Sequence, residues 1–394
     1  MGGILTLDDF DVKGKRVLLR VDLNSPVIKG KVILSDRIIE HVKTIKDLCN
    51  KKAIVVILAH QGRKGDDDFI SLKQHSKLLN RFVKVKFVDD IIGEKAINEI
   101  KSLKEGEALL LENVRFLKEE TDTSENNLFV KRLAPLFDLF VLDAFSVAHR
   151  AQASVTGFSK VLPSCLGRSA EKELKFLGKI KNMNNVLYIL AGAKIEENLL
   201  LMEHALKNKT NRIIVAGLLG QLCLIASGVN LGAQNKFLEK KGLIQFVPKL
   251  KKLIRRHRSK IEMPIDVAVK ARGKRKEVDT KDFPQDDEIF DIGKKTINKY
   301  IGIIKKARVI FMKGPPGYYQ EKQFRLGTIK IFNAVPKRAF SVIGGGDTTT
   351  AMKLARINKS RFTYASLSGG ALSEYLAGKK LAGIEALKQK RFFK

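Results

Sequence analysis

The sequence predicts an α/β protein with parallel β-sheets, organised as two domains. Short runs rich in Val, Ile, Leu and Phe alternate with longer stretches of helical period, which is the pattern of βαβ units. The chain has 394 residues, of which 44% are hydrophobic and 29% charged, a composition typical of folded globular proteins. At this length two domains can each bury a core of their own.

The candidate strands fall into two sets, one in each half of the chain. The first set is Arg16 to Val21, Ala53 to Ala59, Lys84 to Val88, Ala108 to Leu111 and Leu139 to Leu142. The second set is Val186 to Ala191, Arg212 to Ala216, Glu262 to Val269, Val309 to Met312, Phe340 to Ile343 and Phe362 to Ser366. Between the sets, SAEKELKFLGKIKN has the charged, helical period of a connecting helix. We therefore expect domains at 1–165 and 186–371, a connecting helix within 166–185 and a final segment at 372–394.

Several classes of protein are excluded by simple counts. No run approaches the ~20 apolar residues of a membrane span, and the first residues lack the basic-then-apolar order of a signal peptide. The three cysteines, Cys49, Cys165 and Cys223, are too scattered for a disulfide framework or a metal site. We expect a cytoplasmic protein without membrane contact.

The chain is strongly basic. Lys plus Arg is 74 and Asp plus Glu is 42, which gives a formal net charge of +32. The electrostatic field of so positively charged a protein attracts polyanions of any kind. Basic residues are dense at Lys249 to Lys260, Lys270 to Lys276 and Lys388 to Lys394, but no nucleic-acid-binding motif accompanies them. Two interpretations stay open: solvated faces, which the missing motifs favour, and a surface for nucleic acid or another polyanion.

The strands of the first half end in anion-binding residue types. VDLNSP, HQGR, ENVRF and DAFSVAHR follow four of these strands, and ligands of parallel sheets bind at the carboxyl ends of strands. These segments and the SDR string carry Arg37, His60, Arg63, Arg115, His149 and Arg150. Guanidinium groups hold carboxylates and phosphates with two bonds each, so the array suits a small, multiply charged anion. The alternative is a set of surface arginines paired with carboxylates.

The strands of the second half end in glycine-rich loops instead: AGAK, KGPPG, GGGDTTT and SLSGGA. Glycine lets successive N–H groups converge on phosphate oxygens, and a helix that starts after such a loop attracts anions. Asp347, in the third loop, is a suitable oxygen ligand for Mg²⁺. Each loop alone is compatible with a plain turn, but four at one sheet edge favour a nucleotide phosphate site.

The known nucleotide and nucleophile motifs are absent from the sequence. It contains no G-x-x-x-x-G-K-[ST] string, no G-x-G-x-x-G with an acidic residue at dinucleotide spacing and no G-x-S-x-G elbow. An anion-binding half and a nucleotide-binding half remain. Phosphoryl transfer between them is the simplest hypothesis, because that chemistry requires mainly positioning and charge stabilisation.

Seven strings give a family resemblance. RVLLRVDLNSP, HQGR, LLLENVRF, DAFSVAHRAQAS, AGAK, DIGKKT and GGGDTT occur in the order found in phosphoglycerate kinases, which the chain resembles over essentially its whole length. SLSGGA and HQGR resemble the archaeal branch. The resemblance implies two Rossmann-like three-layer domains with parallel sheets facing a central cleft, a hinge helix at 166–185 and a segment at 372–394 that folds back on the N-terminal domain.

The implied activity is a reversible, Mg²⁺-dependent phosphoryl transfer in glycolysis and gluconeogenesis. 1,3-Bisphosphoglycerate and ADP give 3-phosphoglycerate and ATP, in a protein expected to be a monomer, with a dimer as the alternative. By resemblance, 3-phosphoglycerate is bound by Asp22, Asn24, Arg37, His60, Arg63, Arg115 and Arg150. Arg37 would be nearest the reaction, Lys194 would steady the moving group, and Gly369 and Gly370 would receive its charge. The implied nucleotide-binding residues are Gly192, Lys194, Asn198, Gly314, Gln320, Gly344, Gly345, Gly346, Asp347 and Thr348, with Asp347 contacting Mg²⁺.

Three positions depart from the family pattern. Lys313 replaces an asparagine, Gln320 replaces the glutamate expected to hold the ribose hydroxyls, and Asn198 replaces a second lysine of bacterial and eukaryotic members. Gln320 can still hydrogen-bond a hydroxyl, with Glu321 beside it. Lys313 could restore the missing cation from another direction. Together with the charge of +32, these changes leave one alternative, a catalytically weakened relative that binds polyanions or nucleic acid.

Overall fold

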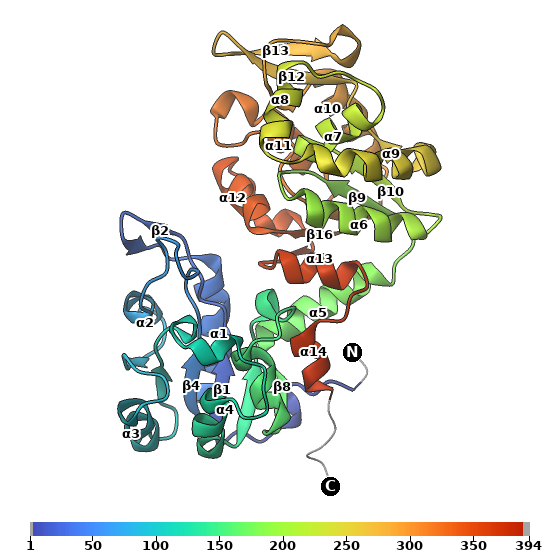
Figure 1. The fold of residues 1–394 in the computed structure, drawn as a ribbon. Helices are drawn as coiled ribbons and strands as arrows, with labels where there is room; N and C mark the ends of the chain where they lie inside the picture. The colour runs from blue at the N-terminus through green and yellow to red at the C-terminus, as the bar shows by residue number, and fades with distance from the viewer. Residues whose placement is uncertain (1–2, 389–394) are drawn as a thin grey trace. The chain divides into compact units, whose positions relative to one another are not determined.

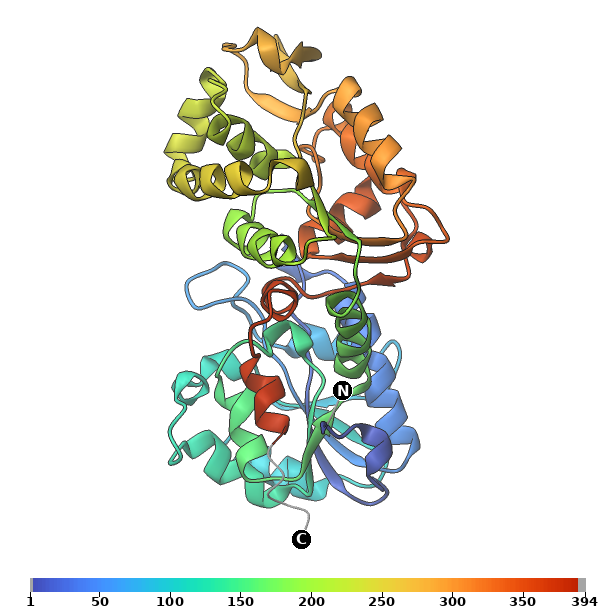
Figure 2. The ribbon, with the colours of Figure 1, turned by 90° about the vertical axis from the view of Figure 1, so that its right-hand side faces the viewer.

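The structure is a computed structural model, describes residues 3–388 and contains two units (Figures 1 and 2). Unit 1 consists of the chain up to Lys175 together with the part that begins at Lys380, and unit 2 is Phe176–Lys379. The division falls inside helix α5 (Arg168–Lys181). Within residues 3–388, none of the helices is long and apolar enough to cross a membrane.

Unit 1 contains a parallel six-stranded sheet in the order β5-β6-β4-β1-β7-β8. These strands are β1 (Arg16–Arg20), β4 (Ile54–Leu58), β5 (Lys86–Phe87), β6 (Ala108–Leu110), β7 (Leu139–Leu142) and β8 (Ser164–Leu166). Its helices are α1 (Asp36–Asn50), α2 (Lys73–Leu79), α3 (Glu94–Ser102) and α4 (Leu128–Leu133), and β2 (Val27–Ile28) and β3 (Lys31–Val32) form a hairpin. Strands β4, β6 and β7 are continuous apolar runs because parallel sheets are covered on both faces, whereas β1 has an arginine at each end.

All five strands predicted in the first half are present, whereas β8 was not predicted. Its sequence, Ser-Cys-Leu, is too short to show a pattern; it pairs with β7 at the end of the sheet order, and Leu166 also forms a single parallel bridge with Thr6.

The C-terminal part of the described chain belongs to unit 1. Helix α14 (Ala382–Leu387) lies among unit 1 elements in both ribbon views, with Ile384 and Leu387 buried. Gly383 N donates to Ala148 O at 2.8 Å, so α14 supports the loop that follows β7. Residues 389–394 of the predicted final segment lie outside the described residues.

The buried carboxylate of Asp143 binds backbone N–H groups in the first turn of helix α5. Asp143, directly after β7, accepts hydrogen bonds from Ser169 N at 2.7 Å and Ala170 N at 3.1 Å. Its other oxygen lies 3.0 Å from His41 Nδ1 in α1. A carboxylate at a helix N-terminus satisfies free N–H groups and favours the positive end of the helix dipole. The strand end, α1 and the start of α5 are thereby joined inside unit 1.

Unit 2 also contains a parallel six-stranded sheet, in the order β11-β10-β9-β15-β16-β17. The strands are β9 (Val186–Leu190), β10 (Arg212–Val215), β11 (Ile261–Glu262), β15 (Val309–Lys313), β16 (Phe340–Gly344) and β17 (Tyr364–Ala365). Its helices after α5 are α6 (Ile195–Lys207), α7 (Gly217–Ala226), α8 (Ala233–Lys240), α9 (Val247–Arg256), α10 (Lys294–Ile304), α11 (Leu326–Ala334), α12 (Gly346–Leu354) and α13 (Gly370–Leu376).

The prediction of one strand from Glu262 to Val269 is wrong. β11 ends at Glu262, and the chain then passes through Pro264 into a second, antiparallel sheet ordered β13-β12-β14. Proline cannot donate a ladder hydrogen bond, so the parallel strand stops there. The antiparallel strands are β12 (Asp266–Ala271), β13 (Lys274–Asp279) and β14 (Ile289–Ile292). In Figure 1, β12 and β13 lie at the far end of unit 2 from α13.

The two densest basic runs of the described chain lie on different elements. Lys251, Lys252, Arg255 and Arg256 are exposed on α9, which buries Leu250 and Ile254 on its opposite side. The run Lys270 to Lys276 forms the turn of the β12–β13 hairpin. Arg272, Lys274 and Lys276 of this run are exposed, whereas Arg275 is mostly buried and pairs with Asp291.

Candidate active site

Arg37 and Asp22 form an ion pair at the carboxyl edge of the unit 1 sheet. Both residues were predicted as site residues, but their pairing was not. Arg37, in the first turn of α1, places Nη1 3.2 Å from Asp22 Oδ2 and donates to Asn24 O at 3.2 Å. Ser146 Oγ also donates to Asp22. Burial by itself raises the pKa of Asp22, but the charge of Arg37 and the hydrogen bond from Ser146 hold it well below its ordinary value. The carboxylate is therefore ionised and fixes the direction of Arg37.

His60 is buried and held by an arginine that the sequence analysis overlooked. Arg20, fully buried at the end of β1, points Nη2 at His60 Nδ1 at 3.1 Å and donates through Nε to Ser154 Oγ at 2.9 Å. Burial and the neighbouring Arg20 charge lower the pKa of His60 well below its ordinary value. The ring is neutral, so Nδ1 accepts and Nε2 carries the proton. A charged residue within an apolar strand was the signal that could have identified Arg20.

The remaining cations of this edge form a like-charge cluster. Burial and the charges of Arg150, Arg20 and Arg63 lower the pKa of Arg115 to about 10. Burial and Arg63 also lower the pKa of Arg150. Arg63 is exposed, whereas Arg115 and Arg150 are half-buried. Cations that destabilise one another in this way are stabilised by an anion, which is the chemistry predicted for this edge.

Hydrogen bonds within the loops fix the positions of this cluster. Gly62 N donates to Asn24 Oδ1 at 2.9 Å, and Arg115 Nη1 donates to Gly62 O. Gln61 accepts from Ser25 N at 2.8 Å, which ties the HQGR loop to the loop after β1. The structure thus brings together Asp22, Asn24, Arg37, His60, Arg115 and Arg150 in one network of contacts and charges, with Arg63 at its exposed side.

The carboxyl edge of the unit 2 sheet contains a small pocket lined by the predicted glycine loops. Its lining is Ala191, Gly192, Ala193, Lys194, Lys313, Gly314, Gly345, Gly346, Asp347, Thr348 and Gly369. Glycine is required at Gly314, whose φ is +84° and whose Cβ would lie 2.0 Å from Ala191 O. Gly345, with φ +101°, precedes the first turn of α12. The loops therefore approach one another more closely than any side chain allows.

Two side chains organise this small pocket. Thr348 Oγ1 accepts from Gly314 N at 2.9 Å and donates to Gly344 O at 2.7 Å, joining two of the loops. Lys194, exposed before α6, lies beside Gly369, since a Cβ at that glycine would be 3.9 Å from Lys194 Nζ. Gly370 begins α13 next to it. A cation and free N–H groups at two helix starts suit phosphate oxygens.

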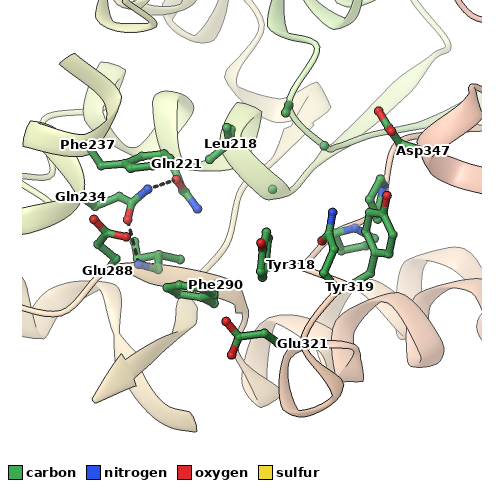
Figure 3. Close-up of a pocket in the computed structure, with 18 of the residues that line it drawn as sticks. Leu218, Gln221, Gln234, Phe237, Glu288, Phe290, Tyr318, Tyr319, Glu321 and Asp347 are labelled. Carbon is green, nitrogen blue, oxygen red and sulfur yellow. Dashed lines mark hydrogen bonds between the residues drawn. The ribbon is translucent and has the colours of Figure 1, made fainter. Parts of the chain in front are cut away.

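A larger pocket of about 720 Å³ adjoins the small one and shares Gly192, Ala193 and Asp347 with it. In Figure 3 Asp347 lies at one end, and Phe237 and Glu288 lie at the other. Between them, the Phe290 and Tyr318 rings meet edge to face, 5.3 Å apart. Apolar walls with a few polar groups are typical of a site for a purine base and its sugar. Phe237, Phe290 and Tyr318 were not predicted from the sequence. Phe290 precedes the DIGKKT string and Tyr318 follows the KGPPG loop, but both lie just outside those strings, and Phe237 is close to none of them.

Two predicted nucleotide residues lie differently from the others. Gln320 is exposed in the lining of the large pocket, next to Glu321, which pairs with Lys270 Nζ at 2.8 Å. Asn198 is fully buried and lines neither pocket; its Nδ2 donates to Ala191 O at 2.6 Å. Asn198 thus contacts the AGAK loop from beneath.

Asp347 has the surroundings that a magnesium ligand requires. Its exposed carboxylate faces both pockets and takes part in no hydrogen bond or ion pair within residues 3–388. That part of the chain contains no cluster of three or more His, Cys, Asp or Glu that could hold a metal alone. Mg²⁺ is commonly bound by one or two carboxylates together with substrate phosphates, so the residues present fit this ion.

Comparisons with known proteins agree with this geometry. The model of the family described as phosphoglycerate kinase matches residues 7–379. A phosphoglycerate kinase of Methanosarcina mazei is 42% identical, with 98% of this chain and 95% of that protein covered. A phosphoglycerate kinase of Sulfurisphaera tokodaii is 40% identical over the same shares. Both relatives are archaeal, as the resemblance predicted.

Solved structures give the same result. The crystal structure of phosphoglycerate kinase from Pyrococcus horikoshii matches with a TM-score of 0.91, 35% identity and 98% coverage of each chain. The enzyme from Coxiella burnetii matches with a TM-score of 0.82, 30% identity and the same coverage. These comparisons do not favour the alternative of a polyanion-binding relative. The α/β fold, the two carboxyl-edge sites and the full-length matches together show that this chain belongs to the phosphoglycerate kinase family of phosphotransferase enzymes.

Proposed function

We propose that the chain catalyses reversible phosphoryl transfer between 1,3-bisphosphoglycerate with ADP and 3-phosphoglycerate with ATP. The observation that carries the proposal is the pair of adjoining pockets in unit 2. An aromatic-walled pocket of about 720 Å³ continues into a glycine-lined pocket that contains Lys194 and Asp347. A nucleoside joined to a polyphosphate has this sequence of an apolar part and a charged part.

The unit 1 cluster supplies the second half of the proposal. 3-Phosphoglycerate carries a carboxylate and a phosphate, and Arg63, Arg115 and Arg150 offer forked donors for such groups. Neutral His60, held at Nδ1 by Arg20, donates through Nε2. Asp22 and Asn24 position the loop and Arg37.

The residues assigned to the transfer step act by position and charge. Arg37 is placed to stabilise the acceptor carboxylate and the charge on the equatorial oxygens, with Lys194 on the nucleotide side. The N–H groups at Gly369 and Gly370 receive the phosphoryl oxygens. Transfer requires the two ligands to meet, so the proposal includes closure about the hinge helix at 166–185.

We propose that Mg²⁺ binds together with the nucleotide. Asp347 would hold it together with phosphate oxygens, and the ion would neutralise the charge of the polyphosphate. We further propose a cytoplasmic monomer. The roles given to the arginines depend neither on the cytoplasmic location nor on the monomeric state.

The test is an assay of ATP consumption with 3-phosphoglycerate and Mg²⁺, run on the purified protein and on Lys194→Ala. Lys207→Ala, at the other end of α6, is the matched control. We expect turnover in the parent and the control and a loss of about 100-fold or more in Lys194→Ala, the magnitude of one transition-state contact. A folded parent that binds 3-phosphoglycerate but turns nothing over would contradict the proposal.

A further inference from the structure

Lys313 ends β15, in the middle of the unit 2 sheet, and its ammonium is buried. The side chain is only 4% exposed, and Nζ lies 2.8 Å from Glu197 Oε2. Burying a charge is tolerated only when it is paired, so this ion pair explains why a lysine can stand here. Lys313 also lines the small pocket together with Lys194 and Asp347. The ammonium is therefore next to the space assigned to phosphates.

Glu197, the partner of Lys313, connects three elements of that pocket. It lies in the first turn of α6, and its Oε2 also accepts from Ser373 Oγ of α13 at 3.0 Å. Burial alone raises the pKa of Glu197, but Lys313, Lys194 and Ser373 together bring it below its ordinary value. The carboxylate is ionised and cancels the charge of Lys313 while no anion is bound.

Position 198, where bacterial and eukaryotic members of the family have a second lysine, does not provide a cation for the phosphates. Asn198 is neutral and its amide is used on Ala191 O. Lys194 and Lys313 are therefore the two cations in the small pocket's lining, and they reach it from different elements. Lys194 is exposed, whereas Lys313 is paired.

We propose that Lys313 is a nucleotide-phosphate ligand that Glu197 masks until a polyphosphate binds. A nucleoside diphosphate or triphosphate brings several negative charges into the small pocket, and its oxygens take over the ammonium from the carboxylate. Glu197 then keeps Ser373 as its partner on α13. The competition lowers the affinity for nucleotide, so removing the Glu197 charge should raise it. This inference rests on the proposed function, because it concerns the nucleotide of that reaction.

The experiment is a calorimetric titration of the whole chain, once with ADP and once with adenosine. Lys313→Met keeps most of the apolar volume and should weaken ADP binding about tenfold, the effect of one charge-assisted hydrogen bond. Adenosine binding should not change, because adenosine has no phosphate. Glu197→Gln keeps the hydrogen-bonding shape without the charge and should strengthen ADP binding several-fold.

The double variant tests whether the two residues act together. If Glu197 acts by masking Lys313, Glu197→Gln should give no gain in the Lys313→Met background. Lys337→Asn, an exposed lysine before β16 at the opposite edge of the sheet, controls for the loss of one charge. Adenosine binding equal to the parent's reports that unit 2, which contains both substituted residues, is folded in each variant.

Three results would overturn the inference. ADP binding by Lys313→Met that equals the parent's would mean that Lys313 does not contact phosphate. Weaker ADP binding in Glu197→Gln would mean that the carboxylate positions the lysine rather than masking it. If Lys313→Met fails to fold, the doubly neutral Lys313→Met/Glu197→Gln variant gives the same ADP comparison. The titrations decide the role of Lys313 even if the parent shows no turnover, so failure of the proposed function is a separate result.

Discussion

Arg37 Nη1 lies 3.2 Å from Asp22 Oδ2, and the same nitrogen donates to the backbone carbonyl of Asn24. Asp22 is buried and ionised, so one face of the guanidinium is anchored while the Arg37 side chain stays 26% exposed. An anchored but accessible arginine can meet a substrate without losing side-chain freedom at that moment.

We predict that Arg37→Ala lowers kcat by about 100-fold or more, because a charge that stabilises the transferring group is lost. KM for 3-phosphoglycerate should change much less, since the Arg63, Arg115 and Arg150 cluster is intact. Steady-state kinetics with each substrate varied separates the two effects. Arg81→Ala, an exposed arginine of unit 1, is the control. Equal losses in kcat and affinity would assign Arg37 to ground-state binding instead.

Phe290→Ala should raise KM for ATP about tenfold, since contact of a base with an aromatic ring contributes roughly 1–3 kcal/mol. The ring is fixed from two sides, by Tyr318 at 5.3 Å between centroids and by Lys270 Nζ at 5.2 Å from its centroid. KM for 3-phosphoglycerate should stay constant, because that ligand is assigned to unit 1. An unchanged KM for ATP would remove the base from this pocket.

The strands and the charged loops could be predicted from the sequence, because each has a local pattern. Buried parallel strands such as β4 are unbroken apolar runs, and Arg115 and Asp347 lie in short strings next to strand ends. The aromatic-walled pocket proposed for the base could not be predicted. Phe237, Phe290 and Tyr318 come from three distant segments, and only the fold brings them together.

The same limit explains the antiparallel sheet of unit 2. β13 has the sequence Lys-Arg-Lys-Glu-Val-Asp, in which only Val278 is buried, so it resembles a charged loop. Its partners β12 and β14 make it a strand. The role of Asn198 could not be predicted from its sequence position either. Its place after the AGAK motif suggests a contact with the ligand, but the side chain is buried and its amide donates to Ala191 O.

His75 should make unit 1 less stable in mild acid. It is fully buried beneath Gln61, whose Oε1 accepts from Nε2 at 3.0 Å, and burial lowers the pKa to about 4 from the ordinary 6.5. Below pH 6.5 the unfolded chain binds a proton that the folded chain does not. Stability present above pH 6.5 is therefore lost as pH falls towards 4, by about 1.4 kcal/mol per pH unit.

Amide hydrogen exchange in β4, measured at pH 7, 6 and 5 and corrected for intrinsic rates, tests this dependence. His75→Gln keeps a donor towards Gln61 without the titration, so its stability should fall less steeply over this range. Identical slopes in the parent and His75→Gln would show that His75 is not the group responsible.

Gly383 links the C-terminal segment to the proposed 3-phosphoglycerate site within unit 1. Its N–H donates to Ala148 O at 2.8 Å, two residues before Arg150. A Cβ at Gly383 would lie 2.8 Å from Val155 Cγ1 and 3.0 Å from Leu142 Cδ2, so in Gly383→Ala either these side chains or α14 must shift. Since overpacking of this kind typically costs about 1–3 kcal/mol and shifts backbone, Arg150 should lose its position.

We therefore expect Gly383→Ala to raise KM for 3-phosphoglycerate several-fold while KM for ATP stays constant. Glu385→Ala, a more exposed position of α14 that pairs only with Lys388 among the described residues, is the control and should leave both constants unchanged. Removing α14 entirely should give at least the Gly383→Ala effect, because the hydrogen bond to Ala148 is then lost as well. If truncation raised neither constant, the loop that carries Arg150 would be held by unit 1 alone, and α14 would have no part in substrate binding.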